Sequence, residues 1–308
     1  MTEFYPEGRL IASPLNSNCL RSKVSLSEAC AEQRILEARA IICDAEHNLI
    51  VDLGCMKGII PREEGALGIK EGTVKDIAVI SRVNRPVCFI VDSIDTDAHG
   101  NPIALLSRRR AQEKCVGEKL SNLKIGDVTQ GRVTHLESFG AFVDIGCGVI
   151  ALMPIDSISV SRIAHPSQRF CVGMDIKTII KNIDNGRISL SHKELLGSWE
   201  ENVSGFTSGE TVAGIIRSVE DYGAFVELTP NLAGLAELKE GIKAGQQASV
   251  YIKNIIPERM KIKLIIIDSF DSPEKIDPPK YFFTGDHLDS FLYSPECCSR
   301  RIETIFSH

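Results

Sequence analysis

Two pairs of aromatic residues have the clearest capacity for chemistry in this sequence. Phe139 and Phe142 lie three positions apart around a Gly-Ala dipeptide, and Tyr222 and Phe225 repeat that spacing around the same dipeptide. An aromatic ring can stack on a nucleic-acid base, and it can equally fill a hydrophobic core. The spacing alone leaves both interpretations open. The elements that carry the rings must therefore be predicted first.

Both aromatic pairs occupy segments with the pattern of β-strands, because apolar residues alternate there with small or charged ones. We expect Phe139 and Tyr222 to be exposed for stacking. The alternation of residues along the strands places Phe142 and Phe225 on one and the same face of the barrel. For these two rings the sequence does not distinguish exposure from packing in the core.

The two aromatic segments belong to repeated units of about five short strands each. The block 48–55 aligns without a gap with 140–147 and marks a third, diverged copy near the start of the chain. In that copy His47 and Ile50 replace the two aromatics. Stacking chemistry is therefore largely lost from the first repeat.

Turn residues support the strand assignment. Asn185-Gly186 lies between two strand-like runs, 175–183 and 187–191. Asn-Gly between alternating strands is a strong hairpin signal, because both turn positions need a positive φ. A polar excursion at 156–170, where we expect a short helix, is reduced in the third repeat.

Units of this size, with glycine at the bends and without long amphipathic helices, favour the five-stranded Greek-key barrel of the OB-fold over a sandwich. We predict an all-β chain of three tandem OB-fold barrels with flanking segments. In the first barrel we expect strands at 76–80, 87–94 and 103–107, and in the tail a helix at 297–306. The predicted boundaries are an N-terminal extension at 1–36 for packing or tethering, barrels at 37–115, 124–196 and 205–270, and an ordered C-terminal tail at 271–308.

Composition excludes several classes of protein. The net charge of −6 argues against a grip on nucleic acid by bulk electrostatics alone, and only 124–196 is slightly basic. No apolar run approaches the ~20 residues of a membrane span. The N-terminus lacks the basic and apolar regions of a secretory signal. We therefore predict a cytoplasmic protein without membrane contact.

Cysteines and sequence motifs give no catalytic or metal site. The ten cysteines include no C-x-x-C pair, so we expect reduced, mostly buried thiols and no bound metal. Phosphate-loop, nucleophile-elbow, zinc-protease and dinucleotide motifs are missing. We predict a non-enzyme without cofactor. The run Arg108-Arg109-Arg110 is compatible with a phosphate contact or with a solvated linker face.

The second repeat closely resembles the RNA-binding barrel of the ribosomal protein S1 family. The resemblance is carried by Phe139-Gly140-Ala141-Phe142-Val143, by a Gly-Asp start at 126–127, and by Gly-Arg-Ile-Ser-Leu-Ser-His-Lys at 186–193. It covers all five strands of this repeat, extends well over the third and weakly but continuously over the first. The whole chain, tail included, is similar to the short S1-like proteins of Gram-positive anaerobes.

The resemblance implies that single-stranded RNA lies across the barrel face formed by strands two and three, with the aromatic pairs stacking on bases. It also implies polar or charged contacts from the hairpin of strands four and five. A Lys-Asn pair that recurs inside otherwise apolar strands predicts phosphate contacts from its lysines. The expected RNA-binding residues are Phe139, Phe142, Lys181, Asp184, Arg187, Tyr222, Phe225 and Lys253. After strand three, where the family usually has a histidine, this chain has Pro61, Pro154 and Glu237.

Two functions remain open at this point. In the first, the chain binds single-stranded RNA, namely mRNA in translation, without catalysis. In the second, the barrels are a protein-interaction scaffold on the ribosome, RNA polymerase or a nuclease, with weak or vestigial RNA affinity. The diverged first units of the family dock on protein partners. The resemblance therefore implies that repeat one contacts the small ribosomal subunit or other RNA-processing proteins.

Overall fold

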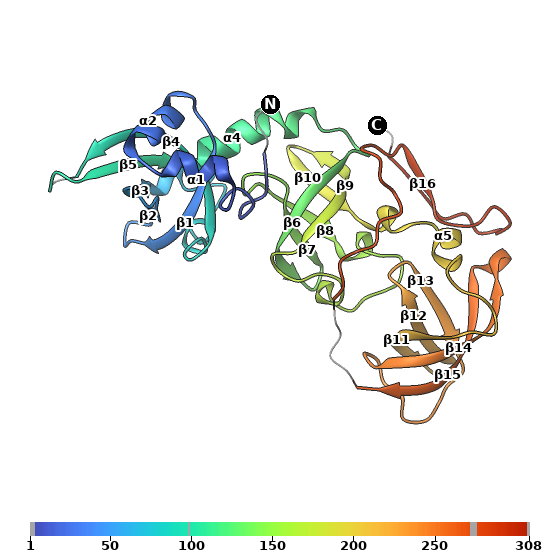
Figure 1. Cartoon of the computed structure of the whole chain (residues 1–308). Coiled ribbons are helices and arrows are strands. Elements are labelled where there is room, and N and C mark those ends of the chain that lie inside the picture. Colours follow the sequence, from blue (N-terminus) through green and yellow to red (C-terminus); the bar gives the residue numbers. More distant parts are fainter. Residues whose placement is uncertain (1–3, 98, 272–275, 307–308) are drawn as a thin grey trace. The chain divides into compact units, whose positions relative to one another are not determined.

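The computed structural model describes residues 4–97, 99–271 and 276–306, which form three closed five-stranded β-barrels with short helices between them (Figure 1). Contacts divide the chain into two units. The first consists of Met1–Leu123 with Asp144–Ile150, and the second of Lys124–Val143 with Ala151–His308.

The first barrel has the strand order β1-β2-β3-β5-β4 and closes where β1 pairs with β4. All pairs are antiparallel except β3 with β5. This is the Greek-key order of the OB-fold, and the predicted all-β fold of three barrels is confirmed. Its strands are β1 (Leu36–Cys43), β2 (Leu49–Asp52), β3 (Lys57–Ile60), β4 (Pro86–Thr96) and β5 (Pro102–Ser107).

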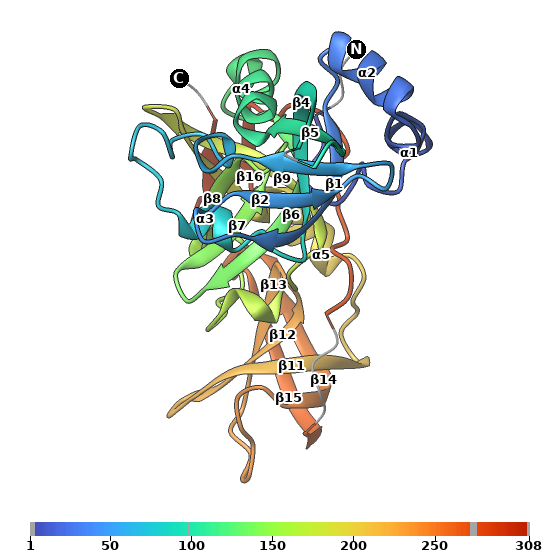
Figure 2. The same ribbon diagram turned by 90° about the vertical axis from the view of Figure 1, so that its left-hand side faces the viewer.

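Two short helices of the N-terminal extension cover one end of this barrel (Figure 2). Helix α1 (Pro14–Leu20) and helix α2 (Lys23–Ala31) each begin at a serine whose hydroxyl accepts a backbone N–H, which satisfies an otherwise unpaired donor. Leu26 and Ala29 of α2 are buried in the barrel core. The extension therefore packs on the barrel, the role expected for it.

The predicted strand at 76–80 is wrong, because this segment is the one-turn helix α3 (Ile77–Ile80) in the connection between β3 and β4. Asp76 begins the helix and pairs with Arg62 at 2.7 Å. Only Val79 is fully buried, which anchors a single turn to the core. So short an apolar run does not distinguish a strand from a helix by its periodicity.

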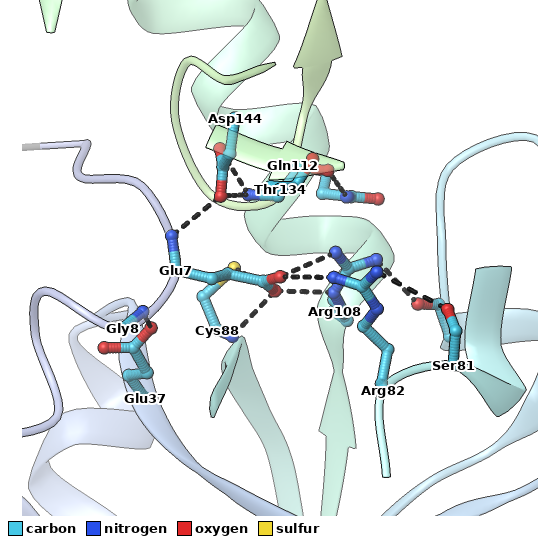
Figure 3. A network of polar contacts seen from close by, with 12 residues as sticks. Glu7, Gly8, Glu37, Ser81, Arg82, Cys88, Arg108, Gln112, Thr134 and Asp144 are labelled. Carbon is cyan, nitrogen blue, oxygen red and sulfur yellow. Dashed lines mark hydrogen bonds and ion pairs between the residues drawn. The ribbon is translucent and has the colours of Figure 1, made fainter. Parts of the chain in front are cut away.

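All three side chains of the run Arg108-Arg109-Arg110 are paired with carboxylates at the start of α4 (Arg108–Glu118), although that of Arg110 stays 40% exposed. Arg108 is buried and donates to both carboxylate oxygens of Glu7, at 2.7 and 3.0 Å (Figure 3). Burial tends to raise the pKa of Glu7, but the attraction of Arg108 outweighs it and holds that pKa below its usual range. The partners of the other two arginines are Glu64, Glu113 and Asp92.

The segment Asp144–Ile150 contributes buried groups to the first unit. The Asp144 carboxylate accepts the backbone N–H groups of Glu7 at 2.7 Å, Gly146 at 2.8 Å and Gly148 at 3.0 Å. Burial nevertheless raises the pKa of Asp144 to about 7. In the same segment, Cys147 is fully buried.

Cys147 lies against two other buried thiols, Cys115 and Cys88, and its contacts with them raise its pKa. All ten cysteines lie in the described residues, and none of them forms a disulfide. Only four are buried, so the expectation of mostly buried thiols holds for fewer than half of them.

The second barrel repeats the topology in the order β10-β8-β7-β6-β9. In its last hairpin, Asn185 and Gly186 have φ values of 49° and 75°. These positive values agree with the turn predicted from the sequence. The polar excursion holds two short 3-10 helices, η3 (Ile155–Ser157) and η4 (Pro166–Gln168). The strands are β6 (Val128–Glu137), β7 (Gly140–Asp144), β8 (Ile150–Pro154), β9 (Asp175–Asp184) and β10 (Arg187–Ser191).

The third barrel has the order β11-β12-β13-β15-β14, and it lies with the second barrel in one unit. The link between them contains the 3-10 helix η5 (Lys193–Leu196) and helix α5 (Trp199–Val203), and Trp199 is buried in the core of the third barrel. The strands are β11 (Thr211–Glu220), β12 (Gly223–Thr229), β13 (Leu232–Ala236), β14 (Gln247–Ile256) and β15 (Lys261–Phe270).

Buried polar groups join the second and third barrels. The side chain of Asn231 accepts the N–H of Val160 and donates to the carbonyls of Lys193 and Gly197, at 2.8 to 3.0 Å. Glu227 of β12 pairs with Arg169 and with Arg217. Because partners from both barrels satisfy these buried groups, the junction has a specific geometry.

The C-terminal tail returns along the second barrel (Figure 1). The N–H of Lys177 donates to the Tyr281 hydroxyl at 2.8 Å, and Phe306 is buried in a cluster with residues of the second barrel. The helix predicted at 297–306 is wrong, because β17 (Glu303–Ile305) pairs there with β16 (Ser290–Leu292). No helix in the described residues is long and apolar enough to cross a membrane.

Candidate nucleic-acid interface

The aromatic pair of the second barrel lies at the start of β7. Phe139 directly precedes the strand and is 54% exposed, and Phe142 within the strand is partly exposed. Their ring centroids are 5.9 Å apart and the rings are nearly perpendicular, at 88°. An edge-to-face pair of this kind is an attractive contact that holds both rings in place. Neither ring belongs to the barrel core.

The third barrel repeats this arrangement at the start of β12. Tyr222 is 70% exposed and Phe225 is 37% exposed, with ring centroids 6.2 Å apart at 87°. Core filling, one of the two interpretations left open by the sequence, is therefore wrong for Phe139 and Tyr222, while Phe142 and Phe225 are partly exposed. A pair with an exposed first ring is a repeated feature of two barrels.

A glycine after the first ring of each pair lets two strands approach closely. A Cβ on Gly140 would lie 2.4 Å from the carbonyl oxygen of Met153 in β8, and one on Gly223 would lie 2.6 Å from that of Ala236 in β13. Real Cβ atoms do not come this close to a backbone oxygen, so only glycine fits without a backbone shift. The glycines thus fix the strand path beside Phe139 and Tyr222.

His135 of β6 joins the pair in the second barrel, and the sequence reasoning did not include it. Its ring centroid is 6.2 Å from that of Phe142. Its Nε2 lies 2.6 Å from a carboxylate oxygen of Glu137, and its side chain is 63% exposed. The sequence did contain a signal for this contact, because His135 lies on the strand that directly precedes the aromatic segment. Side chains on the same face of neighbouring antiparallel strands contact one another.

The two predicted lysines occupy the same unusual position. Lys181 and Lys253 are the extra residues of β-bulges, because they are skipped in the pairing of β9 with β10 and of β14 with β15. A bulge re-aims the side chain of the extra residue. The structure thus explains the recurring lysine as part of the repeated backbone geometry.

The contacts of the two lysines differ. Lys181 Nζ donates to Ser157 Oγ at 2.8 Å. Lys253 is exposed, and its Nζ lies 3.7 Å from a carboxylate oxygen of Glu237. In the first barrel the skipped residue is Asp92, which pairs with Arg110. The extra residue of the bulge is therefore a lysine only in the two barrels that carry an aromatic pair.

Asp184 and Arg187 face each other across the Asn185-Gly186 turn, and both are exposed. Asp184 Oδ1 accepts a hydrogen bond from the Asn185 side chain at 3.0 Å. The structure thus brings the aromatic residues together in pairs. The polar candidates lie on the hairpins of the fourth and fifth strands.

The first barrel lacks an aromatic pair. Ile50 is buried, and His47 Nδ1 lies 3.5 Å from a carboxylate oxygen of Asp76. Its positive φ of 64° places His47 in a turn. Within the described residues, no group of three or more His, Cys, Asp or Glu side chains is arranged to hold a metal ion.

Comparison with known proteins places these features in a family. Residues 122–193 match the family model of the S1 RNA binding domain. Small ribosomal subunit protein bS1 of Leuconostoc lactis is 31% identical over 265 residues, and that of Staphylococcus aureus strain COL is 30% identical over 285 residues. The matches cover 80% and 86% of this chain.

The chain spans 59% of the Leuconostoc lactis protein and 70% of the Staphylococcus aureus protein. Among solved structures, a multidomain protein with nucleic acid binding domains from Streptococcus pneumoniae is 15% identical, with a TM-score of 0.25. That match covers 78% of this chain and 75% of the other. On the sequence relationships, this chain belongs to the family of small ribosomal subunit protein bS1.

Proposed function

We propose that this protein binds single-stranded RNA without catalysis, and that its target is mRNA during translation. The observation that carries the proposal is the exposed, edge-to-face aromatic pair at corresponding places of the second and third barrels. Two such pairs on one chain offer separate stacking platforms. Single-stranded RNA suits them, because its unpaired bases can leave their own stack and lie on a ring.

Stacking is the main source of affinity in this proposal. A base on an aromatic side chain contributes about 1 to 3 kcal/mol regardless of its identity. The net charge of −6 gives no general attraction for phosphate, so the ionic share rests on local groups. For that role we propose Lys181, Arg187 and Lys253, with Asp184 beside the hairpin as a polar contact.

The first barrel has a different role in this proposal. It lacks an aromatic pair, and its bulge position holds Asp92 in place of lysine. The named relatives are proteins of the small ribosomal subunit. We therefore propose that the first barrel contacts a protein, the small ribosomal subunit or another RNA-processing protein, and that the chain works in the cytoplasm.

A direct test compares three variants by fluorescence anisotropy with a labelled, unstructured RNA. Phe139→Ala with Phe142→Ala should weaken binding by about tenfold or more, because a stacking platform worth at least 1.4 kcal/mol is lost. Tyr222→Ala with Phe225→Ala should weaken it less, since the match to the S1 RNA binding domain covers the second barrel, at residues 122–193. Lys124→Ala, an exposed residue away from the pairs, is the control. Equal affinity of all three variants would contradict the proposal.

The competing function, a protein scaffold with vestigial RNA affinity, is favoured by the features of the first barrel. Crosslinking in cells followed by identification of the attached RNA and protein separates the two. Recovery of mRNA or ribosomal components supports RNA binding in translation. Recovery of RNA polymerase or a nuclease without RNA supports the scaffold.

A further inference from the structure

An open cavity of about 460 Å³ lies where the second barrel, the third barrel and the tail meet, all within the second unit. We name it the junction cavity. Residues 168–170 of the second barrel's polar excursion form one wall, and residues of β11 and β12 form another. Residues 276–280 of the tail line a further side. Sites for small molecules typically have volumes of about 300 to 1,000 Å³, so the junction cavity is large enough for a ligand.

Two buried guanidinium groups on the wall share one carboxylate. Arg217 donates to both oxygens of Glu227, at 2.9 and 3.0 Å, and Arg169 pairs with the same carboxylate. None of the three side chains is more than 7% exposed. One carboxylate balances only one of the two arginines. Arginine is also the side chain best suited to a planar or phosphate anion, so this wall favours an anionic ligand.

The other ionisable groups of the lining leave this positive excess unchanged. Among the described residues, Lys280 and Asp277 are the further charged side chains that line the cavity, and their charges offset each other. His192 also lines it, and burial lowers the pKa of His192 to about 4, so the ring is neutral at neutral pH. The lining therefore carries one net positive charge. A phosphodiester carries one negative charge, which matches it.

The rest of the lining suits a nucleobase. Ile215 of the third barrel and Pro278 and Pro279 of the tail supply apolar surface. Gln247 of β14 lines the cavity beside Ile215, its partner in the pairing of β11 with β14. A side-chain amide offers both a donor and an acceptor to the edge of a base. Apolar walls with a few polar groups are the usual composition of a ligand site.

The junction cavity lies on the face of the third barrel that carries the aromatic pair. Phe225 and Glu227 are two residues apart in β12, so their side chains lie on the same face, about 7 Å apart along the strand. Arg217 is the extra residue of a bulge in β11, and it directly precedes Ser218, the partner of Phe225. A nucleotide stacked on Phe225 therefore has its neighbour in the strand within reach of the cavity.

We propose that the junction cavity is a nucleotide-binding site, in which Arg169 and Arg217 hold the phosphate and the apolar wall receives the base. The ligand chemistry is one base with one phosphate, which a strand of RNA and a free nucleoside monophosphate both provide. For a strand, the site rests on the proposed RNA binding and adds a contact beside the aromatic pair of the third barrel. For a free nucleotide, it is independent of that function.

Calorimetric titrations of the full chain test the phosphate contact. Adenosine monophosphate and uridine monophosphate are each compared with the nucleoside that lacks the phosphate. At least one monophosphate should bind about tenfold more tightly than its nucleoside, because charge-assisted hydrogen bonds to the arginines are lost without the phosphate. Anisotropy titrations with a labelled, unstructured RNA test the strand.

A variant that fills the cavity without removing a charge is the main probe. Ala213→Trp, at an exposed residue of the lining, should abolish the preference for the monophosphate and weaken RNA binding about fivefold. Ala244→Trp, at an exposed residue of the third barrel outside the lining, should preserve both. Arg217→Gln should reduce monophosphate binding and leave nucleoside binding unchanged. It also breaks an ion pair with buried Glu227, so thermal unfolding monitors the fold.

Equal binding of monophosphate and nucleoside, together with unchanged RNA affinity in Ala213→Trp, would overturn the proposal. A loss of RNA affinity alone assigns the site to a strand, and a loss of monophosphate binding alone assigns it to a free nucleotide. The proposed function fails separately, when the paired alanine changes at Phe139 and Phe142 leave RNA affinity unaltered. The monophosphate titrations still decide the junction cavity in that case.

Discussion

Phe139 and Tyr222 owe their position to the glycine that follows each of them. The backbone beside these rings lies so close to the next strand that a single methyl group has no room. The spacing of two strands inside the barrel therefore sets the direction in which an aromatic ring points at the surface. A core change at this point should therefore affect RNA binding.

Gly140→Ala tests this link between core spacing and surface geometry. The added Cβ would lie 2.4 Å from the Met153 carbonyl oxygen, so β7 must shift, at a cost of about 1 to 3 kcal/mol in unfolding free energy. RNA affinity should fall as well, because the adjacent rings move. Urea unfolding and an RNA titration measure the two effects. Gly205→Ala is the control, since a Cβ there meets no atom within 4 Å.

Single residues also show where sequence reasoning succeeds and where it stops. The aromatic pairs were identified because their spacing repeats within the chain. The partners of the arginine run were not, because Glu7 is 101 residues away from Arg108. Nothing in local periodicity encodes such a contact. The RNA-binding roles of the eight chosen residues and the domain boundaries stay predictions.

Among the elements, strands were predicted well because alternation and turn residues agree. The predicted run 187–191 coincides with β10, and its Asn-Gly turn has the expected positive φ values. The errors fall on two short segments, α3 in a connection of the first repeat and β17 in the tail. The conformation of α3 follows from a single buried contact and that of β17 from its pairing with β16, and neither is encoded in the periodicity of so short a segment.

Burial of His192 at the end of the second barrel should make stability depend on pH. His192 is fully buried, its Nδ1 lies 3.0 Å from the Ile158 carbonyl oxygen, and its Nε2 lies 3.3 Å from the Tyr281 hydroxyl. Burial lowers the pKa of His192 to about 4. The unfolded chain binds this proton near pH 6.5 and the folded chain only near pH 4. The unfolding free energy should therefore fall between these values as the pH drops, by up to about 3 kcal/mol.

Urea unfolding at pH 7 and at pH 4.5 measures this decrease in the free energy of unfolding. His192→Asn keeps a hydrogen-bond donor but cannot take up the proton, so its decrease should be smaller. His99→Asn, at an exposed residue of the first unit, should show the wild-type decrease. A decrease in His192→Asn as large as that of the wild type would remove His192 as its cause.

At the scale of the whole molecule, the three barrels share one topology and differ in what covers them. The first carries helices of the N-terminal extension, and the second carries the tail. The third buries Trp199 from the link and Tyr293 from the tail in its core. Repeats of one barrel thus acquire separate roles through the segments between them.

Removal of residues 276–308 should destabilise the second unit. The truncated chain loses Tyr293, whose hydroxyl donates to the Asn231 carbonyl at 2.5 Å, and the buried Phe306. Loss of one buried aromatic side chain typically costs about 3 to 5 kcal/mol. Calorimetry should show a lower melting temperature for the second unit. Cys297→Ser, an exposed change within the same tail, should leave the temperature unchanged. An unaltered melting temperature after truncation would show that the tail contributes no stability.

The three clustered thiols of the first unit make alkylation a probe of native packing. Cys147 belongs to the second repeat by sequence, but it is buried against Cys88 and Cys115. Burial raises the pKa of Cys88 to about 11, which leaves almost no reactive thiolate at neutral pH. A fragment that begins at Lys124 would retain Cys147 without either neighbour. Its labelling rate would then reveal that a cut chosen between sequence repeats divides a packed cluster.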